Sequence, residues 1–253
     1  MKLIKRTWSI CKNVLFFLVV IINGCSLSDS KEHNNTVEFS DAGIVLSFDD
    51  YYPGPWEQHF DLFDKYGVKV TFFVTGNSVT DFMLNAQSRG HEIGYHTIRH
   101  PDLRRLSEEE FFEETISRIS IFEDAGIELT SFAYPYGYYQ LWMHDELLKY
   151  YKIVRGFGVF DLKLYTIDDM KFGFIDSLSI DNIMYRLAGY NRADFHNHID
   201  AMLKSAKENE SIIVLTSHSI ANNDWGITPE RLEYIFQKSR EYGLKFYRFR
   251  DFQ

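Results

Sequence analysis

Acidic and imidazole side chains that could bind a metal or move a proton stand at the ends of short apolar runs. Asp49 and Asp50 follow the run GIVLSF, and His218 follows the run IIVLTS. His96 and His100 are four residues apart in HTIRHP. Two histidines on one turn and a carboxylate from a neighbouring segment can bind one divalent cation and leave positions open for water and substrate.

Each of these signals is weak when it stands alone. An Asp after a strand often caps the next helix, and a His that ends an apolar strand is often satisfied by backbone groups. A lone HxxxH pair also occurs in ordinary turns. The information therefore lies in the ordered combination, and in whether the fold brings the three segments together.

Short apolar runs alternate along the chain with longer segments of helical periodicity. The runs that indicate strands are residues 43–48, 68–74, 92–96, 131–134, 153–157 and 211–216. Helices are expected over residues 56–66, 79–89, 141–151, 195–209 and 229–242, and over a segment that begins at residue 107. This alternation predicts a single α/β domain around a parallel sheet buried on both faces. The carboxyl ends of parallel strands share one edge, so the three polar segments should converge there.

The helix that begins at Ser107 has the clearest start, because Ser107 and Glu110 can form a capping box. Its expected apolar face consists of Phe112, Ile116, Ile119 and Phe122. Residues 160–192 have mixed strand and loop character and predict no clear element.

The first 40 residues resemble an export signal followed by a polar tether. A basic start and an apolar core at residues 14–22 lead to Asn23, Gly24 and Cys25. This order resembles a bacterial lipoprotein signal, which implies a signal peptide at residues 1–24, a lipidated Cys25 and a flexible tether at residues 25–40. The alternative is an uncleaved membrane anchor. In either case the folded part, residues 41–253, is expected to be exported to the bacterial cell envelope, either the periplasm or the cell surface.

The charge balance and the cysteine content exclude two kinds of protein. The chain has 27 basic and 36 acidic residues, and cleavage after residue 24 would leave 23 basic residues and a net charge of −13. Such a surface disfavours nucleic acid as a partner. Because Cys11 would be lost with the signal, Cys25 would remain as the single cysteine, and no disulfide within the chain is possible.

Taken in order, the motifs resemble those of the polysaccharide deacetylases with the NodB-homology domain, family 4 of the carbohydrate esterases. The segments that carry the resemblance are SFDD at residues 47–50, HTIRHP at 96–101, YPYG at 134–137 and LTSH at 215–218. They are similar to the first, second, third and fifth motifs of the family. The resemblance covers roughly residue 43 to the end of the chain, and it implies a distorted (β/α) barrel in one domain.

The resemblance also implies a reaction, the hydrolysis of acetyl groups on a glycan. One divalent cation would be held by Asp50, His96 and His100; zinc is expected, with cobalt, nickel, iron and manganese as alternatives. Asp49 would be the base, His218 the general acid, and the backbone N–H of Tyr136 a donor to the oxyanion. The expected substrate carries N-acetylated amino sugars, as in peptidoglycan or another cell-envelope glycan.

Two departures from the family pattern leave alternatives open. The third motif usually has an Arg where this chain has Ala133, and we hypothesise that Arg155 replaces it; the alternative is an ordinary surface Arg at a strand end. The fourth motif, an Asp followed closely by Trp, has Asp176 as its nearest counterpart and lacks the Trp. An O-acetyl esterase, or a glycan-binding protein with a degenerate site, is therefore also compatible with the sequence.

For other aromatic and histidine residues near these motifs, the sequence predicts burial or exposure and no part in the reaction. Trp56 is expected to begin a helix and to be buried, whereas Tyr51, which stands where the family usually has Gly, is expected to be exposed. His196 and His198 do not share a helix face and are expected to be ordinary surface residues. His91 is expected to begin a strand.

Overall fold

The computed structural model describes residues 42–253 apart from 159–161, 188 and 190–191. The predictions for the signal peptide at residues 1–24, for Cys25 and for the tether at residues 25–40 lie outside the described residues. Within the described part, no helix combines the length and the apolar composition that a membrane span requires.

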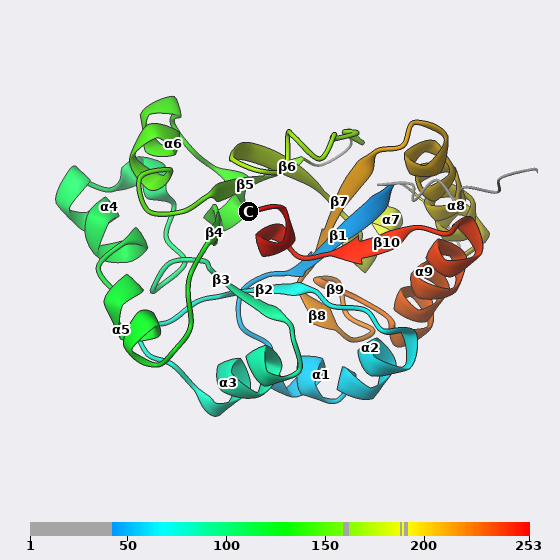
Figure 1. Ribbon diagram of the computed structural model, residues 1–253, viewed down its shortest axis with the longest axis horizontal. Helices are drawn as coiled ribbons and strands as arrows, with labels where there is room; N and C mark the ends of the chain where they lie inside the picture. The colour runs from blue at the N-terminus through cyan, green and yellow to red at the C-terminus, as the bar shows by residue number, and fades with distance from the viewer. Residues whose placement is uncertain (1–41, 159–161, 188, 190–191) are drawn as a thin grey trace, which may run out of the picture. The chain divides into compact units, whose positions relative to one another are not determined.

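Seven parallel strands close into a barrel, as the resemblance predicted (Figure 1). The strands are β1 (Gly43–Phe48), β2 (Thr71–Val74), β3 (Glu92–Tyr95), β4 (Ser131–Ala133), β5 (Ile153–Gly158), β6 (Gly173–Ser179) and β7 (Ile212–Ser217). The barrel closes where β1 pairs with β7 over six residues, from Gly43 opposite Ile212 to Phe48 opposite Ser217. A further strand, β10 (Lys245–Tyr247), pairs with the first half of β1.

Helices surround the barrel (Figure 1), and two of the predicted ones are interrupted. Residues 56–66 form α1 (Pro53–Glu57) and α2 (Phe60–Tyr66), so Trp56 lies near the end of a helix and not at its start. The segment after Ser107 forms α4 (Glu108–Thr115) and α5 (Ile119–Asp124). The other α-helices are α3 (Asp81–Ser88), α6 (Leu141–Leu147), α7 (Asn182–Leu187), α8 (Arg192–Glu208) and α9 (Pro229–Tyr242).

The start of α4 was predicted correctly, but its buried face only in part. Ser107 N–H donates to Glu110 Oε2 at 2.8 Å, and Glu110 N–H donates to Ser107 Oγ at 3.3 Å, which is the expected capping box. Phe111 is fully buried and packs on Trp142, whereas Phe112 is 36% exposed. Of the predicted face, Phe122 is buried and Ile116 and Ile119 pack against the core, so the prediction was wrong only at Phe112. One helical period had been carried across the break between α4 and α5.

Strand residues alternate between the interior of the barrel and the surrounding helices. Ile44 and Leu46 belong to the larger apolar cluster, which includes helix residues, whereas Val45 packs with Phe73 and Ile153 in a second cluster. Successive residues of a strand point to opposite faces. Inward-facing positions therefore recur at every second residue, and polar side chains at these positions near the strand ends can reach the barrel axis.

The C-terminal segment fills the amino end of the barrel. Phe249 and Phe252, on the 3-10 helix η3 (Phe249–Phe252), belong to the same inner cluster as Val45. Beside them the buried Glu92 carboxylate accepts hydrogen bonds from Thr71 and from the Arg250 N–H, and burial raises its pKa. With this end closed, the opposite, carboxyl end of the barrel is left for a site.

Candidate active site

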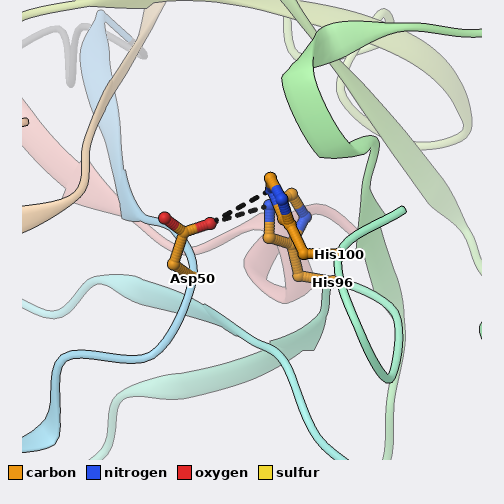
Figure 2. A group of neighbouring side chains, drawn as sticks. All are labelled: Asp50, His96 and His100. Atoms are coloured by element: carbon orange, nitrogen blue, oxygen red, sulfur yellow. Dashed lines mark ion pairs between the residues drawn. The ribbon is translucent and has the colours of Figure 1, made fainter. Parts of the chain in front are cut away.

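Asp50, His96 and His100 come together at the carboxyl ends of β1 and β3 (Figure 2). Asp50 Oδ1 lies 3.4 Å from His96 Nε2 and 3.2 Å from His100 Nε2. One ligand atom from each residue lies within 4.8 Å of the others. The structure thus assembles the three residues predicted to bind a metal.

The atoms of this group suit a divalent cation. His96 Nδ1 lies 2.7 Å from the carbonyl oxygen of Ala133, so Nδ1 carries the proton and Nε2 presents a lone pair towards Asp50. Asp50 Oδ1 is buried with no hydrogen-bond donor in the described chain. Ligands about 2.0–2.1 Å from a tetrahedral zinc ion are about 3.4 Å apart, close to the separations found here.

The ionisation of Asp50 also favours the binding of a divalent cation. Burial opposes the charged form, but the neighbouring imidazoles of His96, His218 and His100 lower the pKa of Asp50 to about 2. Burial also lowers the pKa of His100, which favours its neutral, ligand form. An ionised Asp50 and a neutral His100 are therefore favoured at neutral pH.

The backbone around this group is strained. Asp50, Thr97, His100 and Tyr136 have φ values of 76°, 72°, 57° and 59°, and they are four of the five non-glycine residues with positive φ in the described chain. Such conformations persist only where the surrounding structure enforces them, and they tend to gather at functional sites. Here Thr75 N–H donates to Asp50 O at 2.8 Å, and the next residue, Gly76, donates to Thr97 O at 3.1 Å.

Asp49 pairs with Arg155 inside the barrel. Arg155 Nη2 donates to Asp49 Oδ2 at 2.5 Å, and Nη1 donates to Ser177 Oγ at 2.7 Å. The Arg155 side chain is 1% exposed, so the alternative of a surface Arg is wrong. In the register of β4 and β5, Arg155 stands directly opposite Ala133, where the family usually has its Arg. Asp49 Oδ1 has no donor in the described chain, which leaves one carboxylate oxygen for a water molecule.

His218 pairs with Asp181, a residue that the sequence analysis missed. Asp181 Oδ2 lies 2.8 Å from His218 Nδ1, and Asp181 Oδ1 accepts the His218 N–H at 3.1 Å. Burial acts to lower the pKa of His218, but Asp181, with Asp49 and Asp50, raises it to about 9. With Nδ1 held by the buried Asp181, the Nε2 proton is left for a substrate.

Asp176 was the wrong counterpart of the fourth motif. Its carboxylate pairs with Lys163, and it lies in the middle of β6, whereas Asp181 follows the end of that strand. The strand lies in the segment where no element could be predicted. An Asp just after the strand FIDSLS would have been the better choice, since the other site residues also follow strand ends.

Asp49, Asp50, His96, His100 and His218 line one cavity with a volume of about 510 Å³, and aromatic side chains border it as well. Tyr136 and Tyr138 lie on the side of His100, and the Tyr136 ring is 4.5 Å from the His100 ring. Trp225, between β8 (Ser219–Ile220) and β9 (Gly226–Ile227), lies 5.4 Å from the His218 ring and is 51% exposed. Trp225 was not predicted as a site residue, because it lies far along the chain from the motif that usually carries a Trp.

Of the other aromatic predictions, one was correct and one was wrong. Trp56 is fully buried as predicted, and its Nε1 donates to His218 O at 2.7 Å. Tyr51 is half-buried and not exposed, because its hydroxyl bonds to Thr80 Oγ1 at 2.6 Å.

The remaining histidines lie outside the metal group. His196 stacks on Tyr234 at 3.8 Å, and His198 Nδ1 lies 3.2 Å from the Tyr185 hydroxyl. His91 directly precedes β3 and is buried. Among the described residues, Asp50, His96 and His100 are the one group of three or more His, Cys, Asp or Glu side chains close enough together to hold a metal ion.

The resemblance implied a distorted (β/α) barrel with an Asp-His-His group, and the structure has a parallel barrel with this group at its carboxyl end. Residues 36–151 match the sequence model of the polysaccharide deacetylase family. The chain is 31% identical over 102 residues to the peptidoglycan-N-acetylglucosamine deacetylase PgdA of Listeria monocytogenes, covering 37% of this chain and 21% of that protein. It is 33% identical over 104 residues to the chitin deacetylase of Colletotrichum lindemuthianum, covering 37% and 39%.

Solved structures agree with the fold. The Colletotrichum lindemuthianum chitin deacetylase superposes with a TM-score of 0.58 at 19% identity, over 83% of this chain and 87% of that one. The curated relatives are longer proteins, and the chain spans well under half the length of each relative named above. The resemblance recognised from the motifs is thus confirmed over residues 36–151, which match the polysaccharide deacetylase family.

Proposed function

We propose that this chain is a metal-dependent deacetylase that removes acetyl groups from a polysaccharide or oligosaccharide. The observation that carries the proposal is one cavity lined by Asp50, His96 and His100 together with two proton-transfer candidates, Asp49 and His218. The partners of these two candidates differ in charge: the Asp49 carboxylate pairs with the cationic Arg155, and the His218 imidazole pairs with the acidic Asp181. Such a division fits one base and one acid.

A divalent cation, with zinc as the first candidate, would polarise the acetyl carbonyl as a Lewis acid and activate a water molecule. Asp49 takes the proton of the attacking water through its unpaired Oδ1, while Arg155 orients the carboxylate. The Tyr136 N–H donates a hydrogen bond to the carbonyl oxygen as it gains negative charge. His218, protonated at neutral pH, gives its Nε2 proton to the leaving nitrogen.

The proposed substrate carries N-acetylated amino sugars, as in peptidoglycan or another envelope glycan. This choice is supported by relatives that are named as peptidoglycan and chitin deacetylases. An O-acetylated polysaccharide is the second candidate, since a bifunctional xylanase/deacetylase of Pseudobutyrivibrio xylanivorans is 28% identical over 131 residues, covering 50% of this chain and 22% of that protein.

We also propose that the protein acts in the cell envelope, anchored by lipid on Cys25. Its support is the signal-like sequence at residues 1–24 and the cell-wall substrates of its relatives. A Cys25→Ala variant should move from the membrane fraction to the soluble fraction, and a variant that stays in the membrane would contradict the lipid anchor.

The activity is tested by measuring acetate released from N-acetylated and O-acetylated oligosaccharides. We expect release that stops after chelation, returns with zinc or cobalt, and is lost in His96→Ala. The substrate that yields acetate decides between the amide and the ester. A protein that binds zinc and releases no acetate from any substrate would contradict the proposal and favour the glycan-binding alternative.

A further inference from the structure

Glu114, on α4, is a buried carboxylate with no part in the proposed chemistry. Its side chain is 2% exposed. A buried carboxylate is costly unless hydrogen bonds compensate for the lost water. The partners of Glu114 therefore indicate what this side chain stabilises.

Within the described chain, the Glu114 carboxylate accepts its hydrogen bonds from two residues that lie between His96 and His100. Glu114 Oε2 accepts the Ile98 N–H and the Arg99 N–H, both at 3.0 Å. Glu114 Oε1 accepts Arg99 Nε at 2.5 Å. The Arg99 side chain is 70% exposed, so its ion pair is the weaker part of this contact, and the two amide bonds are the stronger part.

The turn that Glu114 holds is the strained one. Thr97 and His100 both have left-handed backbone conformations. Thr97 is fixed on its other side, where its carbonyl accepts the Gly76 N–H at 3.1 Å and its Oγ1 accepts the His100 N–H at 2.9 Å. Without the carboxylate, two amides would lose their acceptor, and the turn could relax towards an ordinary conformation.

We infer that Glu114 is a positioning residue of the metal site. It fixes the turn at residues 97–100, so that the imidazole of His100 stays beside that of His96 and both face Asp50. The inference rests on the metal site of the proposed function. Groups that orient metal ligands typically change metal affinity by about 10-fold to 100-fold when they are removed.

The test measures zinc affinity of the full chain by competition with a chromophoric chelator. We expect Glu114→Ala to raise the zinc Kd about 10-fold to 100-fold. Glu114→Gln keeps an oxygen that can accept both amides, so it should recover part of the loss, with a Kd at least about threefold above that of the unmodified chain. The matched control is Glu113→Ala, which removes the neighbouring carboxylate on α4 and its ion pair with Arg118; it should leave the Kd unchanged.

A folded Glu114→Ala protein with a zinc Kd within twofold of the unmodified chain would overturn the inference. If Glu114→Ala does not fold, Glu114→Gln decides, and an unchanged Kd in that variant overturns the inference. Affinity is measured without substrate, so the two proposals can fail separately. If the variants bind zinc with the expected order of affinities but the unmodified chain releases no acetate, the role of Glu114 is supported and the proposed activity is contradicted.

Discussion

At the scale of single residues, Arg155 shows that the cation paired with Asp49 can come from a different strand, β5 in place of β4. The position opposite it, Ala133, is too small to reach Asp49, and the register of β4 and β5 brings the longer side chain to the same place. The sequence suggested this exchange, because Arg155 lies in the next predicted strand. Its burial and its bond to Ser177 required the structure.

Replacing Arg155 should impair both stability and catalysis. Arg155→Ala leaves the buried Asp49 without its cation, so we expect a loss of about 3–5 kcal/mol in the free energy of unfolding and of about 100-fold in kcat/KM for acetate release. Urea unfolding and acetate assays measure the two effects. Adding Ala133→Arg to this variant should restore part of the activity, and Arg240→Ala, on the exposed face of α9, serves as the control. Full activity in Arg155→Ala would contradict the pairing as a functional one.

Asp181 should set the alkaline limit of activity. It is the partner that raises the pKa of His218 to about 9 against the effect of burial, and His218 must be protonated to act as an acid. In Asp181→Asn the pKa of His218 falls, so activity is lost at lower pH. We expect the alkaline limb of the kcat/KM profile to move down by about one pH unit or more. An unchanged limb would mean that another group donates the proton.

At the scale of elements, strands were predicted better than helices. The predicted bounds of β1, β5 and β7 agree with the structure within one residue. Helical periodicity does not reveal a break of a few residues, so the pairs α1–α2 and α4–α5 each appeared as one helix. β6 was missed because its residues, GFIDSLS, alternate less clearly, and Asp181 was missed with it.

The capping box at Ser107 gives a prediction at this scale. Ser107→Ala removes the acceptor for the Glu110 N–H, so the free energy of unfolding should fall by about 1 kcal/mol. Ser88→Ala, which removes an exposed hydroxyl at the end of α3, should change it by less than about 0.5 kcal/mol. Equal effects of the two substitutions in urea unfolding would show that the box does not stabilise α4.

At the scale of the whole molecule, the closed barrel and its plugged amino end explain why all the candidate residues face one cavity. The barrel and the shared edge of its strands were predicted from the sequence, whereas the plug at Phe249 and Phe252 was not, because nothing in so short a segment marks it as the filling of a barrel. The same close packing around the barrel buries histidine as well as apolar side chains.

His91 should make the fold sensitive to acid. It is 1% exposed among Phe60, Phe63 and Phe72, and burial lowers its pKa to about 3, against 6.5 for the ordinary group. Between pH 6.5 and about 3, His91 therefore binds a proton in the unfolded chain and stays neutral in the folded chain. Stability that is fully present above pH 6.5 is lost as the pH falls towards 3, by about 1.4 kcal/mol per pH unit from this group.

Urea unfolding between pH 7 and pH 4.5 measures this slope. His91→Phe should reduce it by the contribution of one titrating group, whatever the variant does to stability at pH 7. Phe60→Leu alters the ring that stacks on His91 and keeps the imidazole, so it should lower stability with the slope retained. The same slope in His91→Phe as in the unmodified chain would assign the acid sensitivity to other groups.

The most direct test of the account separates the two adjacent aspartates. Zinc affinity and acetate release are measured side by side for Asp49→Asn and Asp50→Asn. The account predicts that Asp49→Asn binds zinc within about threefold of the unmodified chain and loses at least about 100-fold in kcat/KM, whereas Asp50→Asn loses zinc binding and activity together. Undiminished acetate release from Asp49→Asn would contradict the assignment of base and metal ligand on which the proposed mechanism depends.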